Sequence, residues 1–259
     1  MCTISWLYES HGYQVFFNRD EQVSRAKAKP PEPFSCDHQK STYLMPIDPQ
    51  GLGSWMGVTQ NGVTVCLLNF YQGVTPKGPL VSRGQLVKRL LEQSTLVRML
   101  DTLSHLNVLS YAPFTLLLFS REQKAPYGVC WDGKTHLKRT EVKSPFTSSG
   151  IDFPSVSQHR QDSYQTLLKQ HQGTITASLL FDFHRSHLPS KSMNSVCMHR
   201  EDAQTVSLSH VSVEQDDVVY TYWDGPPCEQ QTKIASTLAQ PSSIISTYGQ
   251  VKSNEKVVL

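Results

Sequence analysis

The sequence predicts an α+β protein in which helices form layers on antiparallel β-structure. Short apolar runs typical of strands, each bounded by turn residues, recur along the chain, whereas helical spacing of apolar residues occurs in only two places. Strands and helices come in blocks, without the regular β-α-β alternation of a parallel sheet. At 259 residues the chain can bury one large core or two small ones. We expect one domain over residues 1–228 and a polar C-terminal extension over 229–259.

The first seventy residues predict two hairpins. Strand candidates at 3–8 and 14–17 are joined by the turn residues Ser10-His11-Gly12. Candidates at 54–58 and 63–70 flank Asn61-Gly62, the strongest short hairpin signal in the chain. Four strands so early indicate an antiparallel sheet.

Apolar residues change to a helical period over residues 82–106, which predicts two helices broken around Ser94 and covering one face of the sheet. A second helical region is expected over 154–171. Further strand candidates are 114–119, 127–131, 136–141, 175–183, 195–199, 205–213 and 218–223.

Residues 26–50 lack a regular pattern and are rich in proline and lysine. Long loops in compact domains usually serve a function. We therefore expect this segment to be a loop over a functional site. The polar residues after Cys228 predict a loosely held C-terminus.

The overall charge excludes some classes of partner. The 24 basic and 22 acidic residues leave a net charge of +2, too small for the whole chain to bind nucleic acid or an anionic membrane. The longest apolar run, near 114–119, falls far short of the roughly 20 residues that span a bilayer. The N-terminus lacks the features of a secretory signal, so we expect a cytoplasmic protein with no membrane span and no nucleic-acid partner.

The six cysteines are widely scattered, without a C-x-x-C pair or a short Cys/His cluster of metal-ligand spacing. We therefore expect neither a zinc ribbon nor a covalent c-type haem, and no metal or organic cofactor. Cys66, Cys130 and Cys197 lie in apolar runs, where a thiol usually acts as a small buried hydrophobe.

Cys2 differs from the other cysteines because of its position. Methionine before a small residue is normally removed, which would leave a cysteine that carries both a thiol and a free α-amine. The ordinary pKa values, about 7.7–8.0 for the amine and about 8.5 for the thiol, allow proton transfer between the two near neutral pH. This combination is a nucleophile with its own base.

Polar residues at two other strand ends fit the same chemistry. Arg19 and Asp20 end a strand that should pair with the strand of Cys2, so that Arg19 would lower the thiol pKa and Asp20 would hold the amine. Asn69 ends an apolar strand and could donate to the oxyanion formed when a thiolate attacks a carbonyl. Each of these also has an ordinary interpretation, as a charged hairpin end or as an asparagine turn.

Several motifs, in order, resemble the NRDE family, also called the transport-and-Golgi-organisation family. They are Met1-Cys2-Thr3, Phe17-Asn18-Arg19-Asp20-Glu21, Gly53-Ser54-Trp55-Met56-Gly57-Val58, Asn61-Gly62 and Leu68-Asn69-Phe70. The resemblance is clear over about the first 110 residues and weaker over 144–213. The family in turn is similar to N-terminal-nucleophile hydrolases such as penicillin V acylase and choloylglycine hydrolase, which implies a four-layer αββα sandwich.

The resemblance implies a role for each of the four residues already singled out. Cys2 matches the nucleophile, Arg19 and Asp20 the charged pair beside it, and Asn69 the oxyanion asparagine. The positions that would contact substrate differ from those of the acylases. Thr147-Ser148-Ser149 stands where the acylases have a second asparagine, and only Lys191 and Asn194 lie near the place of their late arginine. Penicillin and bile-salt substrates are therefore not expected.

The resulting hypothesis is hydrolysis of the amide or thioester bond of a small acylated molecule through an acyl-Cys2 intermediate. Candidate substrate-binding residues are Trp6, Trp55, Phe70, Tyr71 and Ser148, although the aromatic ones also suit an ordinary core. An acyltransferase would use the same intermediate. The alternative from another class is a non-catalytic protein that binds or transports a lipid, acyl-CoA or haem. His184 and His187 could contact such a ligand, but surface or loop histidines fit the sequence better.

Overall fold

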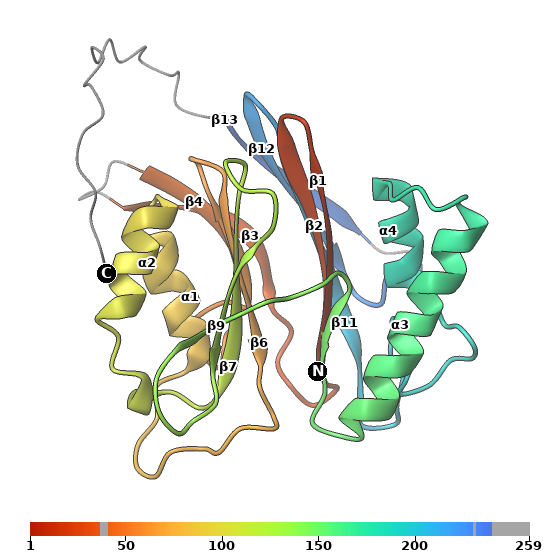
Figure 1. Cartoon of the computed structure of the whole chain (residues 1–259), viewed down its shortest axis with the longest axis horizontal. Helices are drawn as coiled ribbons and strands as arrows, with labels where there is room; N and C mark the ends of the chain where they lie inside the picture. Colours follow the sequence, from red (N-terminus) through yellow and green to blue (C-terminus); the bar gives the residue numbers. More distant parts are fainter. Residues whose placement is uncertain (37–40, 230–231, 240–259) are drawn as a thin grey trace, which may run out of the picture.

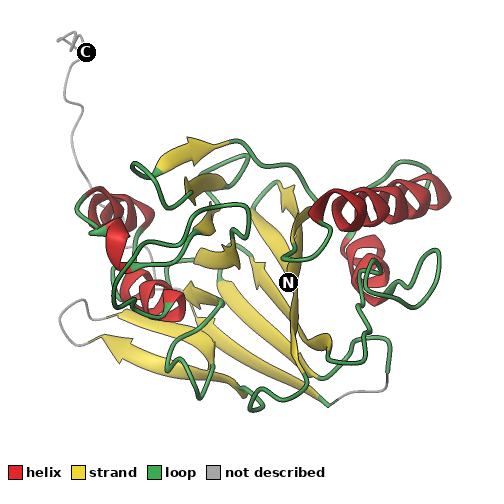
Figure 2. Cartoon of the chain, turned by 90° about the horizontal axis from the view of Figure 1, so that it is seen from below, coloured by secondary structure: helices red, strands yellow, loops and turns green. Residues whose placement is uncertain are grey.

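Two antiparallel sheets face each other, and helices cover the outer face of each (Figure 1). The computed structural model describes residues 1–36, 41–229 and 232–239. Seen from below, helices flank the strands on both sides (Figure 2). The expected four-layer αββα sandwich is confirmed.

The first sheet has six strands and carries the N-terminus. Its order is β10 (Phe146–Ser148), β1 (Cys2–Glu9), β2 (Gly12–Gln22), β11 (Ala203–Val213), β12 (Asp217–Asp224) and β13 (Lys233–Ala239). Helices α3 (Phe153–Gln170) and α4 (Ala177–Arg185) lie on its outer face (Figure 1).

The second sheet has seven strands. Its order is β3 (Lys29–Cys36), β4 (Ser41–Ile47), β5 (Met56–Thr59), β6 (Val63–Asn69), β7 (Phe114–Ser120), β8 (Tyr127–Trp131) and β9 (Lys138–Thr140). Helices α1 (Arg83–Leu91) and α2 (Leu96–Ser104) cover it, and a short 3-10 helix, Val108–Ser110, follows them.

Alternate side chains of a strand face the core between the sheets and the outer helices, and this alternation holds the layers together. On β1, Ile4 and Trp6 are buried in the core between the sheets, whereas the Ser5 hydroxyl faces α4, where it is 2.9 Å from His184 Nε2. On β7, Leu117 and Phe119 enter the same core, and the intervening leucines pack under α1 and α2. A strand buried on both faces therefore reads as a continuous apolar run.

Several expected elements are confirmed. The helical region 82–106 is two helices, and between them Ser94 takes a positive φ of 59°, which ends the first one. The Asn61-Gly62 turn joins β5 to β6, with Gly62 at φ 71° as this hairpin turn requires. No helix in the described part of the chain is both long and apolar enough to cross a membrane.

Other expectations were wrong. Residues 26–50 are mostly β3, at the edge of the seven-stranded sheet, and its neighbour β4. The prolines of β3 fit there because proline is tolerated at a sheet edge. Residues 175–183 form α4, whose first turn is capped by the Thr176 hydroxyl accepting from Leu179 N–H. Residues 195–199 form a loop with a single bridge at His199.

The predicted C-terminal extension 229–259 was wrong in part. Residues 233–239 form β13, which pairs with β12 and so belongs to the six-stranded sheet. Its alternating small and polar residues are typical of an edge strand and gave a weak strand signal. Residues 230–231 and 240–259 lie outside the described part of the chain.

Candidate functional site

Cys2 is the first residue of β1 and lies between two neighbouring strands. Its backbone partners are Arg19 on β2 and Ser148 on β10. Asp20 N–H donates to the Met1 carbonyl over 3.1 Å. The hairpin register therefore brings the Arg19-Asp20 pair beside Cys2, as the sequence predicts.

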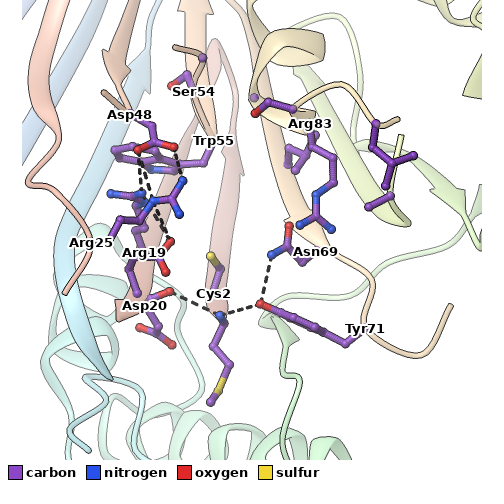
Figure 3. Close-up of a pocket in the computed structure, with 18 of the residues that line it drawn as sticks. Cys2, Arg19, Asp20, Arg25, Asp48, Ser54, Trp55, Asn69, Tyr71 and Arg83 are labelled. Carbon is purple, nitrogen blue, oxygen red and sulfur yellow. Dashed lines mark hydrogen bonds and ion pairs between the residues drawn. The ribbon is translucent and has the colours of Figure 1, made fainter. Parts of the chain in front are cut away.

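A cavity of about 520 Å³ lies in front of Cys2. All four candidate catalytic residues, Cys2, Arg19, Asp20 and Asn69, line it. Figure 3 shows Cys2 between Arg19 and Asp20 on one side and Asn69 on the other. Other lining residues are Glu21, Arg25, Asp48, Trp55, Tyr71 and Arg83. The cavity thus joins the ends of strands from both sheets.

Asn69 is the last residue of β6, in the sheet opposite Cys2. Its side-chain amide donates to the Tyr71 hydroxyl over 3.0 Å. The Met1 α-amine donates to the same hydroxyl over 3.2 Å and to the Asp20 carbonyl over 3.4 Å (Figure 3). Tyr71 therefore links the oxyanion candidate to the amine end of the chain.

The Asp20 carboxylate is buried and has two partners. Arg160 Nη2 lies 3.2 Å from Oδ2, and the Thr205 hydroxyl donates to Oδ1 over 2.7 Å. Arg160 also donates to the Thr3 hydroxyl. We expected the Asp20 side chain to hold the amine. That role concerns the α-amine of Cys2 after removal of Met1 and stays a prediction; here the Met1 amine contacts the Asp20 backbone carbonyl, and the Asp20 carboxylate ties β2 to α3 and β11.

The Arg19 side chain packs against an aromatic ring and pairs with two carboxylates. Its guanidinium lies 4.2 Å from the centre of the Trp55 ring, an arrangement that is attractive for a cation. It also pairs with Glu21 at 3.5 Å and with Asp48 at 3.7 Å. Arg25 binds Asp48 more closely, at 2.5 Å. One face of the cavity is therefore a network of alternating charges.

Burial and charge act in opposite directions on the Cys2 thiol. Burial raises its pKa above the ordinary value, and the Asp20 carboxylate adds to this, while the α-amine and Arg19 lower the pKa. The pKa of the Met1 amine is raised: burial lowers it, but Cys2, Tyr71 and Asp20 together outweigh burial. Both shifts favour the protonated forms, an ammonium on Met1 and a neutral thiol on Cys2.

Two arginines of the site were missed by the sequence analysis. Arg83 begins α1, donates to the Pro113 carbonyl over 2.9 Å and lies beside Asn69 at the cavity (Figure 3). Burial lowers its pKa. Arg160 lies on α3 and is fully buried. Neither gives a signal in the sequence, because each is one of several polar residues in its helix and nothing in the pattern marks it as the inward-facing one.

The candidate substrate-binding residues separate into two groups. Trp55 and Tyr71 line the cavity. Trp6 packs in the core between the sheets, 5.5 Å from Phe119 in an edge-to-face contact, so its expected role in the pocket was wrong. Phe70 is half-buried in the turn after β6. Ser148 is buried opposite Cys2, and its hydroxyl has no hydrogen-bond partner in the described part of the chain.

His184 is not the surface histidine that the sequence suggested. It is fully buried on α4, where burial first, and then the charges of Arg160 and His210, lower its pKa to about 3. His187 follows the helix and is half-buried. Only His187 lies in a loop, as expected.

The comparisons with known proteins agree with this architecture. The model of the Transport and Golgi organisation 2 (TANGO2) family matches residues 1–249. A search of curated proteins found no match. Penicillin V acylase from Agrobacterium tumefaciens superposes with a TM-score of 0.60 at 10% identity, covering 91% of this chain and 85% of that one.

Two further solved structures are similar. The C2A mutant of conjugated bile acid hydrolase from Clostridium perfringens has a TM-score of 0.55 at 11% identity over 100% of both chains. The N-acylethanolamine-hydrolyzing acid amidase ortholog of Caenorhabditis elegans has a TM-score of 0.51 at 12% identity, covering 81% of this chain and 92% of that one. The protein therefore belongs to the Transport and Golgi organisation 2 family and has the fold of the N-terminal-nucleophile hydrolases.

Proposed function

We propose that the protein is a cysteine hydrolase that cleaves the amide or thioester bond of a small acylated molecule through an acyl-Cys2 intermediate. The observation that carries this proposal is the single cavity in which the Cys2 thiol, Arg19 and Asn69 meet. The structural neighbours support an acyl substrate, since they are named an acylase, a conjugated bile acid hydrolase and an N-acylethanolamine-hydrolyzing amidase.

The proposed reaction begins with removal of Met1, which frees the α-amine of Cys2. This amine accepts the thiol proton, and the thiolate attacks the substrate carbonyl carbon. A C–S bond forms while the carbonyl electron pair moves to oxygen, where the Asn69 amide donates a hydrogen bond. The amine or thiol leaving group departs with the proton from the α-ammonium. Water then hydrolyses the thioester, the α-amine relays its proton, and the acid is released with Cys2 restored.

The cavity favours an acylated substrate with a polar or anionic portion. Three arginines, Arg19, Arg25 and Arg83, line its wall, and Arg19 and Arg25 already face carboxylates. Arg83 donates to a backbone carbonyl and lies beside Asn69, so we assign it to the anionic portion of the substrate.

The test is intact-mass analysis of the full chain after incubation with a panel of N-acyl amides and acyl thioesters. We expect loss of Met1, a transient acyl adduct on Cys2 and substrate turnover that Cys2→Ala abolishes. The matched control Cys130→Ser, a half-buried thiol on β8, should keep activity. Full turnover by Cys2→Ala would contradict the mechanism.

A ligand-binding function is the second candidate, and the Met1 amine favours it. That amine already donates to Tyr71 and Asp20 inside the cavity, so a protein that keeps Met1 has no free amine on Cys2. The same cavity would then hold a lipid, acyl-CoA or haem without cleaving it. Retained Met1, no adduct, and saturable quenching of tryptophan fluorescence by such a ligand, weakened in Trp55→Phe, would support this function over hydrolysis.

A further inference from the structure

Four side chains meet outside the lining of the Cys2 cavity: His187, Cys197, His199 and Cys228. They come from three separate segments, one after α4, one before β11 and one after β12. Their nearest nitrogen and sulfur atoms all lie within 4.8 Å of one another. This Cys/His cluster is the only group of its kind in the described part of the chain.

Two distances within the Cys/His cluster match those between neighbouring ligands of a metal ion. His199 Nε2 lies 3.6 Å from Cys197 Sγ and 3.4 Å from Cys228 Sγ. Bond lengths of 2.0–2.1 Å to nitrogen and 2.3 Å to sulfur place neighbouring ligands of a tetrahedral zinc ion about 3.5 Å apart. The His187 and His199 rings are 5.1 Å apart, centre to centre. The cluster therefore needs little rearrangement to surround an ion.

The surroundings also indicate a ligand. Cys197 is fully buried, and His187 Nε2 is buried with no hydrogen-bond partner in the described part of the chain. A buried polar atom without a partner costs free energy, and a bound ion would supply the partner. Both cysteines are free thiols.

We propose that the Cys/His cluster binds one Zn²⁺ ion through two thiolates and two imidazoles. This donor set and a tetrahedral geometry are those of structural zinc sites, in which four protein ligands close the coordination shell. Binding replaces the two thiol protons with two S–Zn bonds and releases both protons to solvent. No oxidant or reductant is needed.

The ion would fix the position of the loop before β11, which hydrogen bonds connect to Asp20. Within this loop Cys197 N–H donates to the Ser186 carbonyl over 3.0 Å. Next to Cys197, Met198 N–H donates over 2.8 Å to the Thr205 hydroxyl, which in turn donates to the Asp20 carboxylate. Zinc bound here would therefore hold in place the chain that supports Asp20, without contacting the substrate.

The first test is the metal content of the untagged full chain, measured by elemental analysis after growth with added zinc. We expect one zinc per chain in the wild type and in the control Cys130→Ser. Cys228→Ser should bind zinc at least ~10–100-fold more weakly, because loss of even an outer-shell partner of a ligand costs that much. Equal zinc content in Cys228→Ser and Cys130→Ser would overturn the proposal.

A second measurement does not depend on how well a variant folds. Metal-free wild-type protein titrated with Co²⁺ should develop the near-ultraviolet thiolate-to-cobalt charge transfer and the intense visible bands of a tetrahedral site, saturating at one ion per chain. Absence of these bands would overturn the proposal. So would a freshly purified protein that lacks zinc and in which peptide mass analysis finds Cys197 and Cys228 joined by a disulfide.

Discussion

At the scale of single residues, the charge beside Cys2 decides how reactive its thiol is. Burial holds the pKa of the thiol above its ordinary value, and Arg19 is one of the groups that lower it. Replacement of Arg19 by glutamine removes this opposing charge. We therefore expect the Arg19→Gln variant to require a higher pH for the same rate of Cys2 alkylation by iodoacetamide, followed by peptide mass analysis.

Arg25→Gln is the matched control. Arg25 lines the same cavity and pairs with the same Asp48 carboxylate. It is not among the main causes that shift the pKa of the Cys2 thiol. The alkylation profile of this variant should stay at the wild-type pH. An equal shift in both variants would mean that the whole charge network, and not Arg19 itself, tunes the thiol.

Much of the candidate site could be predicted at this scale, because strand ends in a hairpin register place residues together. Cys2 and Arg19 are backbone partners, which the turn at Ser10-His11-Gly12 already implied. Arg83 and Arg160 could not be predicted, since no rule of periodicity says which polar position of a helix faces inward. The Cys/His cluster was hidden for another reason, because its members come from separate loops that span 42 residues from His187 to Cys228.

At the scale of elements, a buried ion pair joins α3 to β2. Both Arg160 and Asp20 have fully buried side chains, 3.2 Å apart. Removal of one partner leaves an uncompensated buried charge, which typically costs about 3–5 kcal/mol. We expect Arg160→Met to lower the free energy of unfolding by about that amount in urea titrations. The double variant Arg160→Met/Asp20→Asn should lose less, and an equal loss would argue against charge as the cause.

Buried strands and buried helices of apolar composition are hard to tell apart in this sequence, for a physical reason. A strand buried on both faces, such as β7, needs only a run of apolar residues. Helix α4 has the same kind of composition, and its helical state depends on the Thr176 cap and on packing against β2. Propensity alone therefore assigned residues 175–183 to a strand.

Two histidines between α4 and the six-stranded sheet make stability depend on pH. The rings of His184 and His210 both stack on Phe16, with ring centres 5.9 and 4.1 Å from it. Burial is the main cause that lowers their pKa values, to about 3 and about 4. Below about pH 6.5 the unfolded chain takes up protons that the folded protein does not bind. The free energy of unfolding should therefore fall as pH falls from 6.5 to 4.

The slope of the unfolding free energy against pH tests whether His210 causes part of this dependence. Each one contributes up to about 1.4 kcal/mol per pH unit, so His210→Gln should reduce the slope by about that amount. Glutamine keeps a donor for the Gln14 side chain, which His210 Nε2 contacts at 2.9 Å. His136→Gln, at an exposed loop position, should leave the slope unchanged. The measurement is chemical denaturation at several pH values, and identical slopes in all three proteins would disprove the assignment.

At the scale of the whole molecule, the cavity exists only because two sheets hold a fixed distance from each other. Cys2 belongs to one sheet and Asn69 to the other. The core between the sheets is mostly apolar, and apolar packing tolerates sliding more readily than hydrogen bonds do. Directional contacts across this core are therefore the ones that set the geometry of the site.

Tyr13 makes such a contact. It lies on β2. Its buried hydroxyl donates over 3.0 Å to the carbonyl of Gly62, in the turn before β6, and lies 2.8 Å from the hydroxyl of Thr64 on β6 of the opposite sheet. Tyr13→Phe leaves these buried groups without their partner, which typically costs about 1–3 kcal/mol. We expect that loss in urea unfolding, together with slower acylation of Cys2 if the distance between the sheets controls the cavity.

Tyr127→Phe, on β8 under Arg139, should change stability by less than about 0.5 kcal/mol. A destabilised Tyr13→Phe protein with unchanged Cys2 reactivity would show that the geometry of the site does not depend on this contact.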